Sequence, residues 1–167
     1  MIIRPETTAD LDGIRRVEID AFANHPVSRQ TEHLIVDALR DAGVLTISLV
    51  AEDDGDIVGH VAFSPILIDG AEGRWFTLGP VGVLPARQRQ GIGSKLIEAG
   101  LDALRRLGAE GCVLVGPPDY YRRFGFRATD SLIFPNIPPE YFLILPLSGA
   151  VPRGEIAIHP AFFVEPK

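Results

Sequence analysis

The chain has 167 residues, 46% of them hydrophobic and 23% charged, which is enough for one globular domain with an apolar core. Its formal charge of -6 argues against binding to nucleic acid or an anionic membrane, because either would need a strong local basic patch. A single cysteine, Cys112, excludes an internal disulfide and a multi-cysteine zinc site, so we expect no metal.

The N-terminal third predicts a short strand and two helices. A short strand is expected within Met1 to Pro5. These residues lack the charged region followed by an apolar region that a signal peptide has, so we expect a cytoplasmic protein. Thr7 to Asp10 form a capping box, which predicts a helix with Leu11, Ile14, Val17 and Ala21 on its apolar face. A second helix is expected from Ser28 to Gly43, with Leu34, Ile35, Ala38 and Leu39 buried.

The middle of the chain predicts antiparallel strands. Apolar and polar residues alternate from Leu45 to Glu52, and the turn Asp53 to Asp56 leads into a return strand at 57–64. A third strand is expected at about 74–84. It contains Gly79 and Pro80, which predict a bulge or a local opening because proline cannot donate a ladder hydrogen bond.

The remainder predicts a helix between buried strands. A glycine-rich segment opens a helix that ends at Gly108, and Gly111 to Val115 form a short apolar strand of the kind buried within a sheet. Two further strands are expected at 141–147 and 155–158. The order of elements predicts one domain over residues 1–167 with a mixed α/β fold.

The segment from Val81 to Leu96 is the most informative in the sequence. It places a strand end, a loop and a helix start in succession, and Gly91 and Gly93 allow a ligand to approach the backbone. A helix start presents free N–H groups and a partial positive charge to an anion. Arg87 and Arg89 add cations to the same place. This arrangement predicts a site for a phosphate or pyrophosphate.

Three kinds of phosphate loop are possible here. A P-loop needs a Gly-Lys-Ser/Thr triplet, whereas Gly93-Ser94-Lys95 has another order, and a dinucleotide loop needs a third glycine where Leu96 stands. The third kind is Gln/Arg-x-x-Gly-x-Gly/Ala after a strand, which Gln88-Arg89-Gln90-Gly91-Ile92-Gly93 meets. This segment resembles the coenzyme A pyrophosphate loop of the GNAT acetyltransferase superfamily. An ordinary turn into a surface helix is the alternative interpretation of the six residues alone.

The resemblance extends from about Ile2 to Phe126 and implies a fold and a cofactor. It implies a mostly antiparallel sheet in which a splayed pair of central strands receives the pantetheine arm of acetyl-CoA, flanked by helices. The residues implied to bind acetyl-CoA are Val81, Val83, Gln88, Arg89, Gln90, Gly91, Ile92, Gly93 and Ser94. The terminal run from Tyr141 is similar to that of a subgroup of bacterial GNAT proteins. The chain departs from many members after the strand 111–115, where they have an Asn and this chain has Gly116-Pro117-Pro118.

The same resemblance implies an acid catalyst. Tyr121-Arg122-Arg123-Phe124-Gly125-Phe126 is similar to the family's Tyr-x-x-φ-Gly-Phe segment, whose tyrosine often donates a proton to the departing CoA thiolate. Tyr121 is therefore the expected catalytic residue, with Tyr120 as its rival and a core aromatic as the alternative role. The general base stays open among five candidates, Glu18, Asp20, His25, Glu32 and His60.

These features together predict an acetyl-CoA-dependent N-acetyltransferase acting by direct transfer. The expected partner is a small-molecule amine or a protein amine, with no nucleic acid and no membrane, and pairing into a homodimer stays open. The acceptor is expected between the loop around His25 and the segment 133–141. Two alternatives are a noncatalytic CoA-binding or regulatory module on the same fold, and a nucleotide- or phosphate-binding interaction protein.

Overall fold

The computed structural model describes residues 1–166, which form four α-helices and nine strands. The helices are α1 (Leu11–Phe22), α2 (Glu32–Asp41), α3 (Ile92–Arg106) and the single turn α4 (Pro118–Tyr121). The strands are β1 (Ile2–Pro5), β2 (Ile47–Asp53), β3 (Asp56–Ile68), β4 (Ala71–Val83), β5 (Gly111–Val115), β6 (Arg127–Ala128), β7 (Leu132–Ile133), β8 (Phe142–Pro146) and β9 (Gly154–Ala157). None of the helices within 1–166 is long and apolar enough to cross a membrane.

The second helix begins later than the sequence pattern predicts. Helix α2 starts at Glu32 instead of Ser28, because the Ser28 hydroxyl donates to the Glu32 carboxylate across the preceding turn. This hydrogen bond holds 28–31 outside the helix. The buried face also differs from the prediction: Val36 is fully buried, whereas Leu34 and Ala38 are only partly covered.

The strands form one mixed sheet. The order along it is β1-β2-β3-β4-β5-β8-β6, with β9 against the end of β3 and β7 beside β9. Strands β4 and β5 are parallel, as are β7 and β9, and the other pairs are antiparallel. The predicted mostly antiparallel sheet is confirmed. Strand β3 runs four residues beyond its expected end at Ser64 and continues through Pro65.

The predicted opening of the third strand is also confirmed. Between the pairs Phe63–Leu78 and Val61–Val81, strand β4 has two residues, Gly79 and Pro80, where β3 has one, which is a β-bulge. Pairing of β4 with β5 reaches only as far as Thr77 opposite Val113, although β4 continues to Val83. Among residues 1–166, the last residues of β4 therefore have β3 on one side and no strand on the other.

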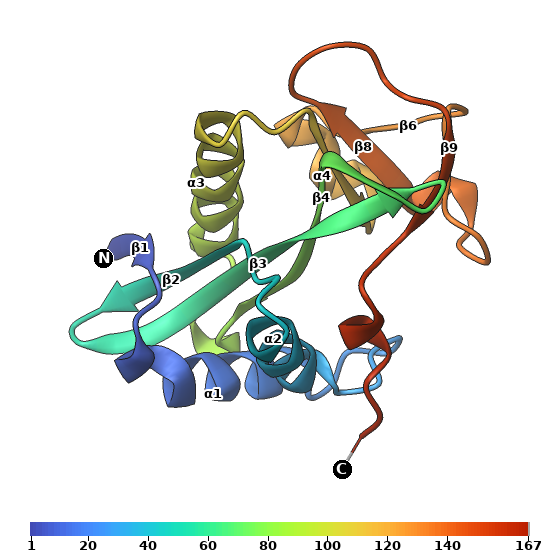
Figure 1. Ribbon diagram of the computed structural model, residues 1–167. Helices are drawn as coiled ribbons and strands as arrows, with labels where there is room; N and C mark the ends of the chain where they lie inside the picture. Colours follow the sequence, from blue (N-terminus) through green and yellow to red (C-terminus); the bar gives the residue numbers. More distant parts are fainter. Residues whose placement is uncertain (167) are drawn as a thin grey trace.

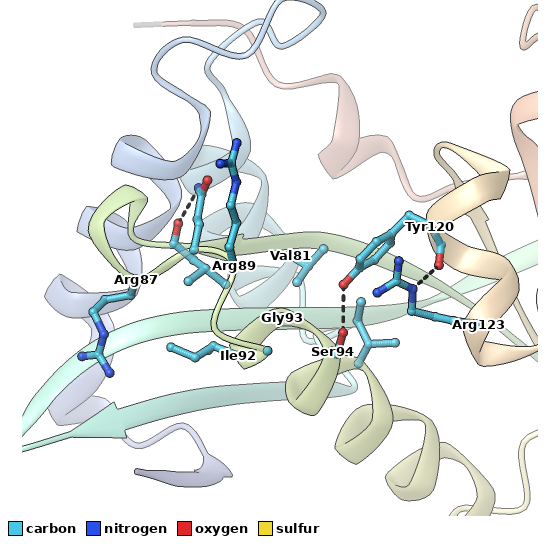
Figure 2. A pocket seen from close by; sticks show the side chains of 12 residues that line it. Val81, Arg87, Arg89, Ile92, Gly93, Ser94, Tyr120 and Arg123 are labelled. Atoms are coloured by element: carbon cyan, nitrogen blue, oxygen red, sulfur yellow. Dashed lines mark hydrogen bonds between the residues drawn. The ribbon is translucent and has the colours of Figure 1, made fainter.

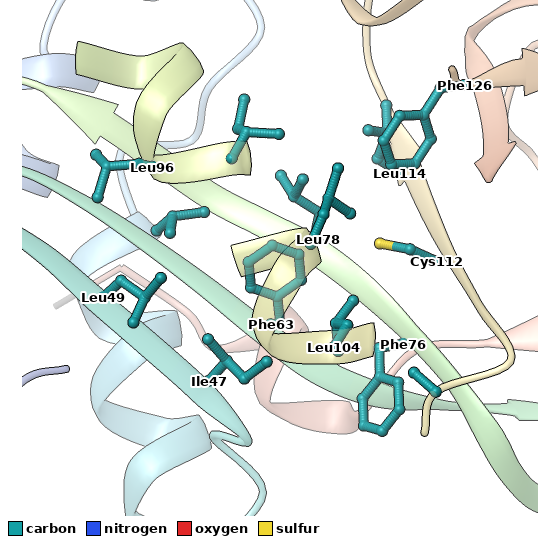
Figure 3. Packing of buried hydrophobic residues seen from close by; sticks show 14 of the residues in the cluster. Ile47, Leu49, Phe63, Phe76, Leu78, Leu96, Leu104, Cys112, Leu114 and Phe126 are labelled. Carbon is teal, nitrogen blue, oxygen red and sulfur yellow. The ribbon is translucent and has the colours of Figure 1, made fainter. Parts of the chain in front are cut away.

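The helices cover opposite faces of the sheet. Helix α3 lies against one face, and α1 and α2 lie against the other (Figure 1). Under α3, Phe63, Leu96 and Leu104 are almost fully excluded from solvent and form the centre of the largest apolar cluster (Figure 3). Ile14 and Val17 of α1 pack on the opposite face of the same strands. The middle of the sheet is thus covered on both faces.

Close packing between α3 and β3 leads to a stability prediction. A Cβ atom at Gly100 would overlap the ring of Phe63, which is fully buried and has no free space to move into. We expect Gly100→Ala to lower the free energy of unfolding by about 1 to 3 kcal/mol, because overpacking outweighs the better helix propensity of alanine. Urea denaturation measures this. Gly73→Ala is the control, since nothing lies within 4 Å of its Cβ position, and equal stability of both variants would contradict the prediction.

Candidate functional site

The loop after β4 and the first turn of α3 expose a row of backbone donors. Gly91 is the N-cap of α3 in the left-handed conformation, with φ of 83°, which glycine adopts without strain. Within residues 1–166, no backbone carbonyl accepts from the N–H groups of Arg89 to Ser94. The N–H of Lys95 is the next along the chain and bonds to the Gly91 carbonyl at 3.1 Å. An anion at this end of α3 would meet several free donors and the positive end of the helix dipole.

A cavity of about 580 Å³ lies in front of these donors. Its lining includes eight of the nine residues predicted to bind the cofactor: Val81, Val83, Gln88, Arg89, Gly91, Ile92, Gly93 and Ser94. Gln90 lies outside the lining, and its side-chain oxygen accepts a hydrogen bond from Arg87 Nε at 3.3 Å. The lining therefore joins the free end of β4 to the start of α3.

Two lining residues come from a more distant part of the chain that the cofactor prediction did not include. Tyr120 and Arg123 approach the start of α3 from the α4 side, facing Ser94 and Gly93 (Figure 2). The Tyr120 hydroxyl lies 3.3 Å from Ser94 Oγ, and the Arg123 guanidinium lies 4.2 Å from the centre of the Tyr120 ring. The sequence signal for both residues was their place within one turn of Tyr121.

The two loop arginines are held differently. Arg87 donates to Asp53 at 2.7 Å, and this hydrogen bond is the main reason that the pKa of Asp53 lies below its usual range. Arg89 has a φ of 63°, is exposed, and makes no ion pair within residues 1–166. Figure 2 shows the two side chains extending from different parts of the loop. Arg89 is therefore the loop cation that is free to contact an incoming anion.

Tyr121 does not line this cavity and lies deeper, at the end of β5. Its ring occupies the space that a side chain at position 116 would need, so Gly116 admits the tyrosine. Phe126 meets the ring edge to face at 6.1 Å. Burial, together with the neighbouring Tyr120 and Cys112, raises the pKa of Tyr121 to about 12. The phenol thus keeps its proton at neutral pH.

The five candidate bases occupy different environments. Asp20 and His25 are exposed, and Glu32 accepts the Ser28 hydroxyl at 2.8 Å. Glu18 and His60 are both fully buried and contact each other at 2.9 Å. Their contact joins α1 to β3, 42 residues apart in the chain. Cys112 is buried in the core, and burial raises the pKa of its thiol far above the usual range, so it is no nucleophile.

Comparisons with known proteins agree with this geometry. Residues 45–128 match the family model described as an acetyltransferase (GNAT) domain. The chain is similar to an uncharacterized N-acetyltransferase, YhbS of Escherichia coli (strain K12), with 38% identity over 128 residues, or 76% of this chain and 74% of that protein.

Two solved structures are similar over nearly the whole chain. A GNAT family acetyltransferase from Brucella melitensis in complex with acetyl-CoA is 52% identical, with a TM-score of 0.88, and 96% of this chain matches 97% of that one. YhbS from Escherichia coli in complex with CoA is 32% identical, with a TM-score of 0.84, over 98% of this chain and 92% of that one.

Proposed function

The chain belongs to the GNAT family of N-acetyltransferases, and we propose that it transfers the acetyl group of acetyl-CoA directly to a primary amine. The observation that carries the cofactor part is the row of unpaired N–H groups from Arg89 to Ser94 at the start of α3. The two similar structures with acetyl-CoA and CoA support it. The nature of the acceptor and the direct transfer are inferred from the chemistry of the site.

The residues at the start of α3 fit a pyrophosphate. A Cβ atom at Gly93 would lie 3.7 Å from both the Tyr120 hydroxyl and Val83 Cγ2, so the glycine leaves a cradle that a larger side chain would fill. N–H donors without a protein partner suit phosphate oxygens, because hydrogen bonds to an anion are stronger than those to a neutral group. Ser94 and Arg89 add side-chain donors on either side of this cradle.

The free edge of β4 fits the pantetheine arm. Beyond Thr77, no strand of the described part of the chain lies on the β5 side of β4, so backbone groups there are available to an added extended chain. Val81 and Val83 line the cavity from this stretch. Backbone donors on the same edge would polarise the thioester carbonyl, as an oxyanion hole does. We infer that the reacting carbonyl lies beside the bulge of β4.

Amine attack on the thioester needs three protein contributions. The amine must be neutral, the carbonyl must be polarised, and the sulfur that leaves needs a proton. Tyr121 keeps its proton because its pKa is raised to about 12 by burial, and its ring lies against Gly116, directly after β5. We assign it the donation of that proton to the departing CoA thiolate.

The direct test of the proposed function is ligand-dependent melting. A ligand at a hundred times its Kd stabilises the folded state by about 2.7 kcal/mol, which is roughly 5 to 10 °C in a domain of this size. Acetyl-CoA should produce such a shift, whereas ATP and NAD should not. An equal response to ATP would favour a general phosphate-binding protein. A response to acetyl-CoA without acetyl transfer would favour a noncatalytic CoA-binding module.

Arg89 should strengthen acetyl-CoA binding by a screened electrostatic contact. Its guanidinium is exposed, so we expect Arg89→Ala to cost about 1 to 2 kcal/mol, or several-fold in Kd, with a larger effect at low salt. Isothermal titration at two ionic strengths measures this, and dephospho-CoA identifies the phosphate concerned. Arg105→Ala, at an exposed position late in α3, is the control. Unchanged affinity at both salt concentrations would show that Arg89 is only a surface cation.

A further inference from the structure

A chain of polar side chains runs through the sheet on the α1 side. The buried Glu18 of α1 contacts His60 Nδ1 at 2.9 Å, and His60 Nε2 contacts Ser48 Oγ of β2 at 2.8 Å. Ser48 in turn is hydrogen-bonded to Glu6, and Arg40 of α2 donates to both Glu6 oxygens at 2.9 Å. Glu18 and His60 have no exposed surface at all. An ionisable pair so deeply buried is costly, so its presence calls for a function.

The hydrogen-bond partners determine where the protons are. Burial acts to raise the pKa of Glu6, but the hydrogen bonds from Arg40 and Ser48 hold it below its ordinary value, so Glu6 is ionised. A carboxylate only accepts hydrogen bonds, so Ser48 donates to Glu6 and accepts from His60 Nε2. His60 Nε2 thus carries one proton. The contact between His60 Nδ1 and Glu18 is a hydrogen bond only if a second proton lies between them, so these two groups share that proton.

One oxygen of Glu18 lacks a partner. Within residues 1–166, Glu18 Oε2 is buried without a hydrogen bond. Both carboxylate oxygens lie 3.2 Å from the Cβ position of Gly82, so the missing side chain lets the carboxylate rest against β4. Gly82 lies between Val81 and Val83, the residues placed at the thioester. The unpaired oxygen therefore lies against β4 between these two residues. Helix α1, which carries Glu18, covers the face of the sheet opposite α3 (Figure 1).

The other end of the chain reaches solvent. Glu6, Arg40 and Ser48 line a surface pocket of about 320 Å³ on the edge of the sheet away from the cofactor cavity. Glu6 is part-exposed there, with 17% of its side chain accessible. Water in this pocket can exchange protons with Glu6. The polar chain thus connects the interior at Gly82 with bulk solvent.

We propose that Glu18 Oε2 accepts the proton of the acceptor amine and that His60, Ser48 and Glu6 pass a proton on to solvent. This inference rests on the proposed function and identifies its missing base. The acceptor ammonium gives one proton to Oε2, and the neutral nitrogen forms a bond to the acetyl carbon. As the C–S bond breaks, its electron pair leaves with sulfur, which takes the Tyr121 proton, and the second N–H proton passes to water. The shared proton moves to Nδ1, the Nε2 proton to Ser48, and the Ser48 proton to Glu6 and water.

The charges around Glu18 suit a base. Burial is the main effect and raises the pKa of its carboxyl, the negative charge of Glu32 on α2 acts in the same direction, and His60 on β3 opposes both. A carboxylate with a raised pKa binds a proton more strongly, so it removes one more readily from an ammonium group. Glu6 and Arg40 form an ion pair at the far end of the chain, where their opposite charges largely offset each other.

The test compares two amines that differ in protonation. n-Butylamine is protonated at neutral pH and needs a base, whereas hydroxylamine is largely unprotonated and does not. We expect Glu18→Gln to lower kcat with n-butylamine by about a hundredfold and with hydroxylamine by less than about threefold. As the pH rises and the free amine forms, the factor by which Glu18→Gln lowers kcat with n-butylamine should shrink about tenfold per pH unit. Thiol release at saturating acetyl-CoA measures both, and Glu98→Gln, at an exposed site on α3, is the matched control.

The outcomes separate this proposal from the proposed function. If the parent transfers acetyl to none of the four acceptors n-butylamine, hydroxylamine, spermidine and a lysine peptide, the proposed function fails and this inference fails with it. The inference alone is wrong if the parent is active and Glu18→Gln lowers kcat by the same factor with n-butylamine and hydroxylamine. It is also wrong if Glu18→Gln keeps the parental pH profile.

A second variant covers the case in which Glu18→Gln does not fold. Ser48→Ala interrupts the chain but leaves the Glu18–His60 contact in place, and its folding is checked by the melting shift with acetyl-CoA. We expect about a tenfold loss of kcat with n-butylamine and almost none with hydroxylamine. Full activity of Ser48→Ala with n-butylamine would contradict the proton path through Ser48.

Discussion

Gly93→Val should abolish the response to acetyl-CoA and leave the unliganded fold intact. The Cβ atom would lie in ordinary contact with Val83 and Tyr120, both 3.7 Å away, and the methyl groups would extend into the cradle between them. Loss of two charge-assisted hydrogen bonds, each worth about 1.5 to 3 kcal/mol, weakens binding about a hundredfold or more. At an acetyl-CoA concentration that shifts the parent by roughly 5 to 10 °C, the variant should shift by about 1 °C.

Gly93 is a better position for this test than Gly91. Gly91 has a φ of 83°, so valine there would strain the backbone and confuse a folding defect with a binding defect. Gly93→Ala is the graded control, because its methyl group reaches only van der Waals contact and should weaken binding partially. A full melting shift in Gly93→Val would show that the pyrophosphate binds elsewhere.

Tyr121→Phe should lower kcat by about a hundredfold while acetyl-CoA affinity stays nearly constant. The value is at the lower end for general acid catalysis, because a thiolate is already a fair leaving group at neutral pH. The ring remains to fill the space beside Gly116, and only the hydroxyl is lost. Because the raised pKa of about 12 keeps the phenol protonated, parental activity should show no loss from Tyr121 ionisation until the pH nears that value. Steady-state kinetics across pH measures both effects.

Tyr120→Phe separates the two neighbouring tyrosines. The Tyr120 hydroxyl faces Ser94 in the cofactor cavity, so its loss should raise the KM for acetyl-CoA and change kcat by less than about threefold. If Tyr120→Phe is the variant that loses kcat, or Tyr121→Phe turns over like the parent, the acid is wrongly assigned. That result would not affect the assignment of the chain to the acetyltransferase family.

The order of elements and the opened strand could be predicted because their signals are local. The alternation after Leu45, the Gly79-Pro80 pair and the glycines of the loop each act on the backbone within a few residues. The predicted start of α2 was wrong because a single hydrogen bond, from Ser28 to Glu32, decides it. The extension of β3 through Pro65 depends on pairing with β4 and β9, which no local pattern indicates.

The residues of the site also divide into those that local sequence predicts and those that only the fold brings together. The loop from Gln88 to Ser94 is continuous in sequence, so its residues could be predicted as a group and all except Gln90 line the cavity. Tyr121 stays a prediction, and its place behind Tyr120 could not be read from spacing because both lie in one short turn. The contact between Glu18 and His60 joins residues 42 apart. Only the folded sheet shows which of the five candidate bases meet.

Transfer of a labelled acetyl group would establish whether the chain acetylates amines. The parent is incubated with acetyl-CoA carrying a deuterated methyl group and a panel of primary amines, and mass spectrometry follows both products. We expect an N-acetylated amine that carries the full label and is formed in equal amount to free CoA. Tight binding of acetyl-CoA with no labelled amine from any member of the panel would contradict the proposed transfer.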